Sequence, residues 1–129
     1  MTSLPSHSAI FCGLGILFLT GLAINISRIR LRHRIFLGHG DVAALQIAVR
    51  THGNTFEHLI PMLLLLVIYE LLGARKLLVD IFGAVILIAR FTHAAAYLAH
   101  WSTLRRVGVA LTYSVEAVLG ATVIAQAMR

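Results

Sequence analysis

The sequence has few charged residues. Asp, Glu, Lys and Arg together make up 12% of its 129 residues, whereas apolar residues make up 59%. A soluble domain normally carries about twice this fraction of charge. A domain of this size also has a high ratio of surface to volume, so it needs a large polar surface. The composition therefore excludes a soluble globular monomer and a disordered chain, and it indicates a small integral membrane protein.

Cysteine is also scarce, because Cys12 is the only one and it lies within an apolar run. One cysteine forms neither an intramolecular disulfide nor a cluster of thiolate ligands. We therefore interpret Cys12 as a small apolar residue. The histidines His52 and His58 lack a carboxylate or cysteine partner at ligand spacing, so we expect no metal or haem site.

The N-terminal part of the chain lacks charge, since no Lys, Arg, Asp or Glu precedes Arg28. Without a positive N-terminal region, we expect the first apolar run to be retained as a span rather than cleaved as a signal peptide. Runs long enough to span a membrane occur at about 7–27, 42–72, 77–99 and 107–128. They are continuous rather than alternating, which argues against a β-barrel. We predict an all-α, up-down four-helix membrane bundle that forms one domain over residues 1–129.

Basic residues dominate the connections between these runs, and the net charge is +6. The first and third connections hold six of them, and the second connection and the C-terminal tail hold three: Arg28, Arg30, Arg32, Arg34, Arg105 and Arg106 against Arg75, Lys76 and Arg129. The positive-inside rule then places both termini outside and the first and third connections in the cytoplasm. No nucleic-acid recognition module is visible, so we expect no nucleic-acid partner.

Charged and polar side chains interrupt the second and third runs. Such residues are costly in lipid, so they face the bundle interior and pair with one another. Two sets each share one helix face, because their members are spaced at i, i+3 or i+4, and i+7. These sets are Arg50, Asn54 and Glu57 in the second run, and Arg90, His93 and Tyr97 in the third.

The two faces also match in depth if the runs are antiparallel neighbours. One vertical shift aligns Glu57 with Arg90, Asn54 with His93, and Arg50 with Tyr97. This shift lies about one residue (~1.5 Å) from the one that a turn at residues 73–76 would set. The pair Glu57–Arg90 taken alone would also fit an ion pair that only fixes the helix register. Together with the arginines of the connections, however, the cluster holds more cation than its acids need, which favours an anionic ligand.

These residues also carry a resemblance to a known family. The segment RTHGNTFEHLIP (50–61) resembles the second-helix signature of the MAPEG family, the membrane-associated proteins of eicosanoid and glutathione metabolism. The segment ARFTHAAAYLAH (89–100) resembles the third-helix pattern, and SRIRLRHRIF (27–36) resembles the basic end of the first helix. The resemblance covers nearly the whole chain, and the length suits the short bacterial branch.

The resemblance implies a homotrimer that binds glutathione, as co-substrate, between subunits near the cytoplasmic face of a bacterial inner membrane. Glu57 would bind the γ-glutamyl amino group, and Arg106 or Arg105 would stabilise the thiolate. It implies glutathione-binding roles for Arg50, Asn54, Glu57, His58, Arg90, His93 and Tyr97, and for Arg30 or Arg28 of an adjacent subunit. A trimer is also expected on physical grounds, because the four helices of one chain cannot enclose this many charged side chains alone. Small residues at 83–84 and 94–96 would permit close helix contact.

The function expected from the resemblance is that of a glutathione transferase or peroxidase. Its second substrate would be a hydrophobic electrophile or a lipid hydroperoxide that arrives from the bilayer between the first and fourth helices. Val107 and Ala110 stand where one branch of the family carries Ser and Tyr, so prostaglandin or leukotriene synthesis is not implied. One alternative is a non-catalytic member that binds glutathione or lipid. Another is a small multidrug transporter, although the first span lacks the acid that such a pathway needs.

Overall fold

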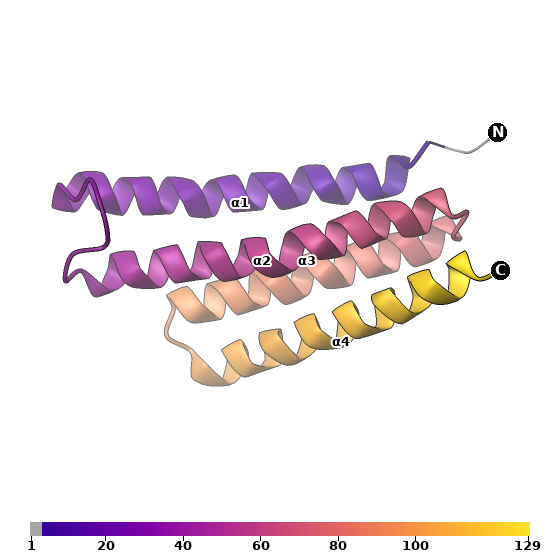
Figure 1. Cartoon of the computed structure of the whole chain (residues 1–129). Helices are drawn as coiled ribbons and strands as arrows, with labels where there is room; N and C mark the ends of the chain where they lie inside the picture. Colours follow the sequence, from indigo (N-terminus) through magenta and orange to yellow (C-terminus); the bar gives the residue numbers. More distant parts are fainter. Residues whose placement is uncertain (1–3) are drawn as a thin grey trace.

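Within residues 4–129, which the computed structural model describes, the chain folds into four α-helices that run alternately up and down (Figure 1). They are α1 (Ser6–His33), α2 (Ala43–Leu71), α3 (Lys76–Leu98) and α4 (Ser102–Ala127). Each is long and apolar enough to cross a membrane. The predicted all-α fold of membrane-spanning helices is therefore confirmed.

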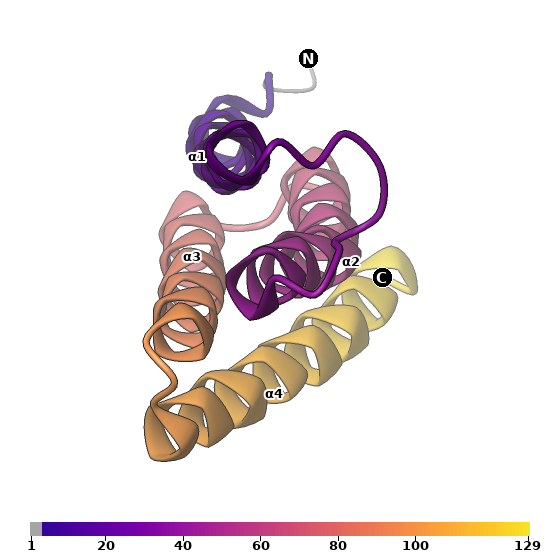
Figure 2. The ribbon, with the colours of Figure 1, turned by 90° about the vertical axis from the view of Figure 1, so that its left-hand side faces the viewer.

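The bundle is flattened, with α2 and α3 as its inner pair (Figure 2). Helix α1 packs against one side of this pair and α4 against the other, and within the described residues α1 and α4 do not touch. This arrangement leaves large apolar side chains on the outer faces. Leu17, Phe91 and Ile124 are each more than 60% exposed. A hydrocarbon solvent covers such a surface without cost, so the chain is a multi-pass membrane protein.

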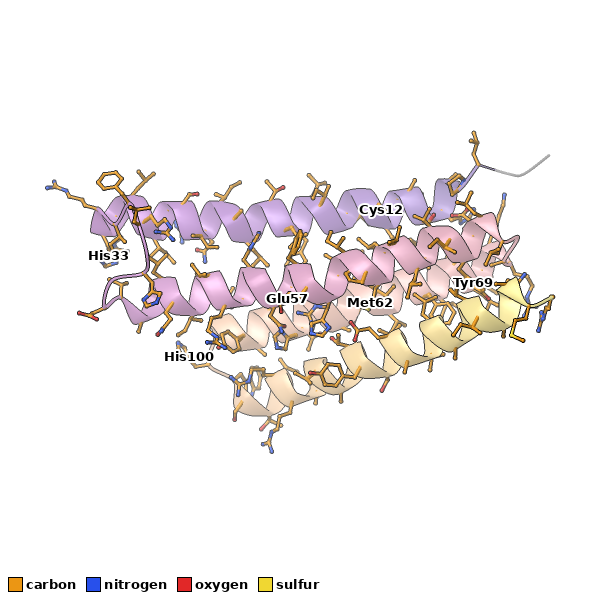
Figure 3. The ribbon with its side chains drawn as sticks, in the orientation of Figure 1. Cys12, His33, Glu57, Met62, Tyr69 and His100 are labelled. Carbon is orange, nitrogen blue, oxygen red and sulfur yellow. The ribbon has the colours of Figure 1, made fainter. Side chains whose placement is uncertain are left out.

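The core lies along the α2–α3 pair and is built from aliphatic side chains with almost no exposed surface, among them Leu59, Leu66, Val79, Ile86 and Leu119. Cys12 is half-buried and packs against this core, which is the apolar role expected from the sequence. Figure 3 shows Cys12 and Tyr69 in the same half of the bundle, away from Glu57.

The turn between α2 and α3 sets their antiparallel alignment, and Gly73 makes it possible. Gly73 has a φ of 81°, a left-handed conformation that glycine adopts without steric cost. Its N–H donates to the carbonyl of Glu70 (3.0 Å), and the N–H of Ala74 donates to the carbonyl of Tyr69 (3.3 Å). This pair of bonds is a Schellman motif, which ends α2 and leads directly into α3.

At the same end of the bundle, Glu70 ties α1 to α2. Helix α1 begins after Pro5 and has no capping side chain of its own. The buried Glu70 carboxylate instead accepts hydrogen bonds from the backbone N–H groups of His7 (3.1 Å) and Ser8 (2.7 Å) and from the Ser8 hydroxyl (2.6 Å). Nδ1 of His7 also lies 2.8 Å from a carboxylate oxygen of Asp80 on α3. A carboxylate at a helix N-terminus satisfies free N–H groups and complements the helix dipole.

Small residues bring the helices of one chain close together. A Cβ atom on Gly83 would lie 2.3 Å from the Phe11 ring of α1. On α4, a Cβ atom on Gly108 would lie 2.7 Å from the backbone N and Cα of His93. Gly83, Ala94 and Ala96 are buried within the chain, so these three are used for packing inside one subunit. Ala84 and Ala95 remain exposed.

Candidate functional site

A polar cavity of about 320 Å³ lies between α2 and α3, in the half of the bundle where α1 ends. Its lining is Arg50, Gly53, Asn54 and Glu57 of α2 and His93 and Tyr97 of α3. The structure thus brings together five of the residues that the sequence singles out. Their i, i+4, i+7 spacing on α2 and the i, i+4 spacing on α3 turn both sets toward the same space. The cavity is large enough for a small peptide ligand to enter in part.

Arg90 is buried (1% exposed) beneath this cavity and links three helices. Its Nη2 donates to Oδ1 of Asn54 on α2 (2.8 Å), and its Nη1 donates to the hydroxyl of Thr112 on α4 (3.0 Å). Its Nη2 also lies 3.4 Å from Nδ1 of His93. Arg90 therefore does not line the cavity but fixes the position of Asn54, which does.

The alignment of Glu57 with Arg90 as a contact pair is wrong. Within residues 4–129, no carboxylate oxygen lies within ion-pair distance of the Arg90 guanidinium, which instead reaches Asn54. The physical reason is the length of the arginine side chain, which spans nearly a helix turn and selects its partner by rotamer rather than by backbone depth. Glu57 is left exposed at the cavity.

An aromatic wall closes the α3 side of the cavity. The rings of His93 and Tyr97 stack with their centroids 6.0 Å apart. The guanidinium carbon of Arg105, on the first turns of α4, lies 5.2 Å from the centroid of Tyr97, within cation–π range. Arg106 is exposed and lines none of the described cavities. Arg105 is therefore the α4 arginine that stands beside the cavity of its own chain.

His58 does not line the cavity, although the sequence grouped it with the glutathione-binding residues. Its Nδ1 lies 2.7 Å from Oε1 of Glu116 on α4, and its ring lies 5.7 Å from that of Tyr113. Glu116 is the one acid among residues 107–128, and the sequence alone does not indicate its partner. Thr112, the α4 partner of Arg90, was missed entirely, because a threonine within an apolar run carries no distinctive signal.

The first-helix arginines lie apart from the cavity of their own chain. Arg30 donates from Nη1 to the carbonyl of Gly38 (2.7 Å) in the α1–α2 connection. Arg28 is exposed at the end of α1. Since α1 and α4 lie on opposite faces of the inner pair (Figure 2), the cavity of one chain does not gather the arginines of α1 together with Arg50 and Arg105.

The cavity is suited to a zwitterionic or anionic ligand. The Arg50 guanidinium can bind a carboxylate in a bidentate manner, the Glu57 carboxylate can bind an ammonium group, and the Asn54 amide can bind a peptide group. Backbone chemistry adds one acceptor. Pro61 lies inside α2 and has no N–H, so the carbonyl of Glu57 lacks its usual helical donor. In the described part of the chain, no group of three or more His, Cys, Asp or Glu side chains is placed to hold a metal ion.

Comparison with known proteins identifies the family. The family model for MAPEG matches residues 8–125. Two curated relatives, both named inner membrane protein YecN, come from the Escherichia coli strains K12 and CFT073. Each is 31% identical to this chain over 106 residues, which covers 82% of this chain and 81% of the relative. The chain thus belongs to the MAPEG family, the membrane proteins of eicosanoid and glutathione metabolism.

Proposed function

We propose that this protein is a glutathione-dependent membrane enzyme of the transferase or peroxidase type. The observation that carries the proposal is the cavity itself, which is lined by Arg50, Asn54 and Glu57 and backed by His93 and Tyr97. Glutathione has two carboxylates, one ammonium group and two peptide bonds. The cavity offers Arg50 for one carboxylate, Glu57 for the ammonium group and Asn54 for a peptide bond.

Thiolate formation is the chemical task of the site. A free thiol has a pKa near 8.5, so little thiolate exists at neutral pH. A fixed guanidinium beside the sulfur stabilises the thiolate and makes it a nucleophile. Arginine suits an apolar site because it keeps its charge there. The position of Arg105 on the Tyr97 ring supports Arg105 in this role, whereas the family resemblance alone allows either Arg106 or Arg105.

In the transferase reaction, the thiolate sulfur forms a bond to the electrophilic carbon of an apolar substrate and a leaving group departs. In the peroxidase reaction, two glutathiones reduce a lipid hydroperoxide to the alcohol and water and become the disulfide. Either substrate partitions into the bilayer. Because α1 and α4 of one chain do not touch, an entry path between a first and a fourth helix would have to run between two subunits.

The proposed assembly is a homotrimer whose adjacent subunit completes the site. Glu116 is an acidic residue within the fourth span, and its side chain is 31% exposed in the isolated chain. Such exposure to lipid is costly, so a neighbouring copy is expected to cover it. The first helix of this neighbour would bring Arg30, or Arg28, to the cavity, because the first helix of the subunit that holds the cavity does not reach it.

The proposed location is a bacterial inner membrane, in keeping with the printed name of the YecN relatives. The cavity end of the bundle holds Arg28 to Arg34, at the end of α1, and Arg105 and Arg106, on the first turns of α4, whereas the opposite end has fewer basic residues. The positive-inside rule therefore places the cavity near the cytoplasm, where glutathione is available, with both termini outside.

Turnover by the purified full-length protein tests this proposal, with glutathione and an electrophilic aryl halide as substrates. We expect thiol-dependent turnover in the wild type, and a loss on the order of 100-fold in either Arg105→Ala or Arg106→Ala, because removing one fixed charge-stabilising donor costs about that much. The variant that loses activity should also lose the ultraviolet absorbance of bound thiolate at neutral pH. Lys76→Ala, at the far end of the bundle, is the matched control and should keep wild-type turnover.

Two results of this assay would count against the proposal. Activity unchanged in both arginine variants would contradict the assigned thiolate chemistry. The absence of both turnover and a thermal shift when glutathione is added to the wild-type protein would contradict the whole proposal. Binding without turnover would instead identify a non-catalytic member of the family.

A further inference from the structure

A second cavity, of about 430 Å³, lies at the opposite end of the bundle from the glutathione site. It lies between the α2–α3 turn and the last turns of α4, and the exposed Arg75 and Arg129 are among its lining residues. Thr122, Gln126 and the buried Tyr69 also line it. Gln126 donates from Nε2 to the carbonyl of Leu72 (3.1 Å), which fastens the end of α4 to the turn and gives the cavity a fixed wall.

At this end of the molecule, the acidic side chains do not lie beside the arginines of the cavity. Its two acids face α1, because Glu70 accepts hydrogen bonds from the start of α1 and Asp80 pairs with His7. No carboxylate side chain is among the residues that line the cavity, and within residues 4–129 neither Arg75 nor Arg129 forms an ion pair. The side chains that line the cavity therefore carry positive charge and no negative charge.

The surroundings of the cavity are apolar and face outward. Leu77 is 70% exposed and Met128 is 84% exposed, and Leu71 and Ile124 are also exposed nearby. These side chains lie at the ends of membrane-spanning helices, where a bilayer would place lipid against them. A ligand that fits here combines a negative head, for the arginines, with apolar chains, for the leucines and methionine.

We propose that this cavity binds the phosphodiester headgroup of an anionic membrane lipid. Arginine is the side chain best suited to bidentate contact with phosphate oxygens, and the second N–H of the Gln126 amide offers a further donor. Basic pockets between membrane helices hold anionic headgroups in this way. A bound lipid would link the α2–α3 turn to the end of α4, and so would stabilise the bundle at the end opposite the glutathione site.

The test is lipid binding by the full chain in mild detergent, followed by native mass measurement and by thermal unfolding. The probes are phosphatidylglycerol, phosphatidylcholine and inorganic phosphate at millimolar concentration. We expect phosphatidylglycerol to bind more tightly than phosphatidylcholine and to raise the unfolding temperature, while inorganic phosphate alone does not. Arg75→Gln and Arg129→Gln should each weaken phosphatidylglycerol binding roughly fivefold, the effect of one basic residue near a membrane surface.

Lys76→Gln is the matched control, because Lys76 adjoins Arg75 in sequence, carries the same charge and does not line the cavity. It should bind phosphatidylglycerol as the wild type does. An equal loss in Lys76→Gln and Arg75→Gln would show diffuse surface charge and overturn the proposal. Equal protection by inorganic phosphate would show a free-anion site and overturn the lipid assignment. Gel filtration and circular dichroism confirm that each variant is folded, independently of any glutathione binding.

Discussion

Replacing Arg90 by lysine is expected to lower the free energy of unfolding by about 2–3 kcal/mol, because two charge-assisted hydrogen bonds in a buried site are lost or weakened. The Arg90 guanidinium spans from Asn54 on α2 to Thr112 on α4. A lysine ammonium is a single point of charge on a flexible stem, so it can satisfy one of these partners but not both. Thermal or denaturant unfolding in detergent measures the loss.

The same variant should weaken glutathione binding, although Arg90 does not line the cavity. Asn54 does line it and would lose the hydrogen bond that fixes its amide. Arg32→Lys, on the exposed end of α1, is the matched control and should change the unfolding free energy by less than about 0.5 kcal/mol. An Arg90→Lys protein with wild-type stability and wild-type glutathione affinity would show that Arg90 does not hold the three helices and the site together.

Replacing Gly108 by alanine is expected to destabilise the protein by about 1–3 kcal/mol, the usual cost of adding a methyl group to a well-packed contact. The new Cβ would lie 2.7 Å from the backbone N and Cα of His93, and a backbone cannot rotate away as a side chain can. Helices α3 and α4 must therefore separate at this point. Because His93 lines the cavity, we also expect glutathione affinity to fall by about tenfold, as displacements of this size strongly weaken aligned contacts.

Gly120→Ala is a control within the same helix. A Cβ atom at Gly120 would meet nothing within 4 Å, so the change adds helix propensity without a clash. It should be neutral or should stabilise the protein by up to about 1 kcal/mol. Opposite signs for the two substitutions would locate the effect in the α3–α4 contact. Equal effects of the two substitutions on stability, whether stabilising or destabilising, would contradict this explanation.

The fold could be predicted because long apolar runs in the sequence indicate membrane-spanning helices. Four continuous apolar runs fix four helices, since only helices satisfy their own backbone groups in lipid. The candidate cavity could be anticipated for a related reason. Arg50, Asn54 and Glu57 share a face of one helix, and His93 and Tyr97 share a face of its neighbour, so the costly polar groups of both helices turn toward the same space.

The contacts that could not be predicted from the sequence depend on how far a side chain extends and on which way each helix face is turned. Arg90 was assigned to Glu57 by depth, but its long side chain binds Asn54 instead. His58 was grouped with the cavity residues by the family resemblance, yet its ring nitrogen lies at hydrogen-bond distance from Glu116 on α4. The Glu70 cap of α1 joins segments that are 62 residues apart, and no local pattern in the sequence connects them.

The central claim is that the cavity between α2 and α3 is a glutathione site, and isothermal calorimetry with glutathione tests it most directly. The measurement uses the purified full-length protein in mild detergent, with Arg50→Gln as the site variant and Lys76→Gln as the control at the far end of the bundle. We predict saturable binding by the wild type and the control, and an affinity at least about tenfold lower in Arg50→Gln, which corresponds to the loss of one charge-assisted contact. Heat no different from the detergent blank in the wild type, or equal affinity in Arg50→Gln, would contradict the claim.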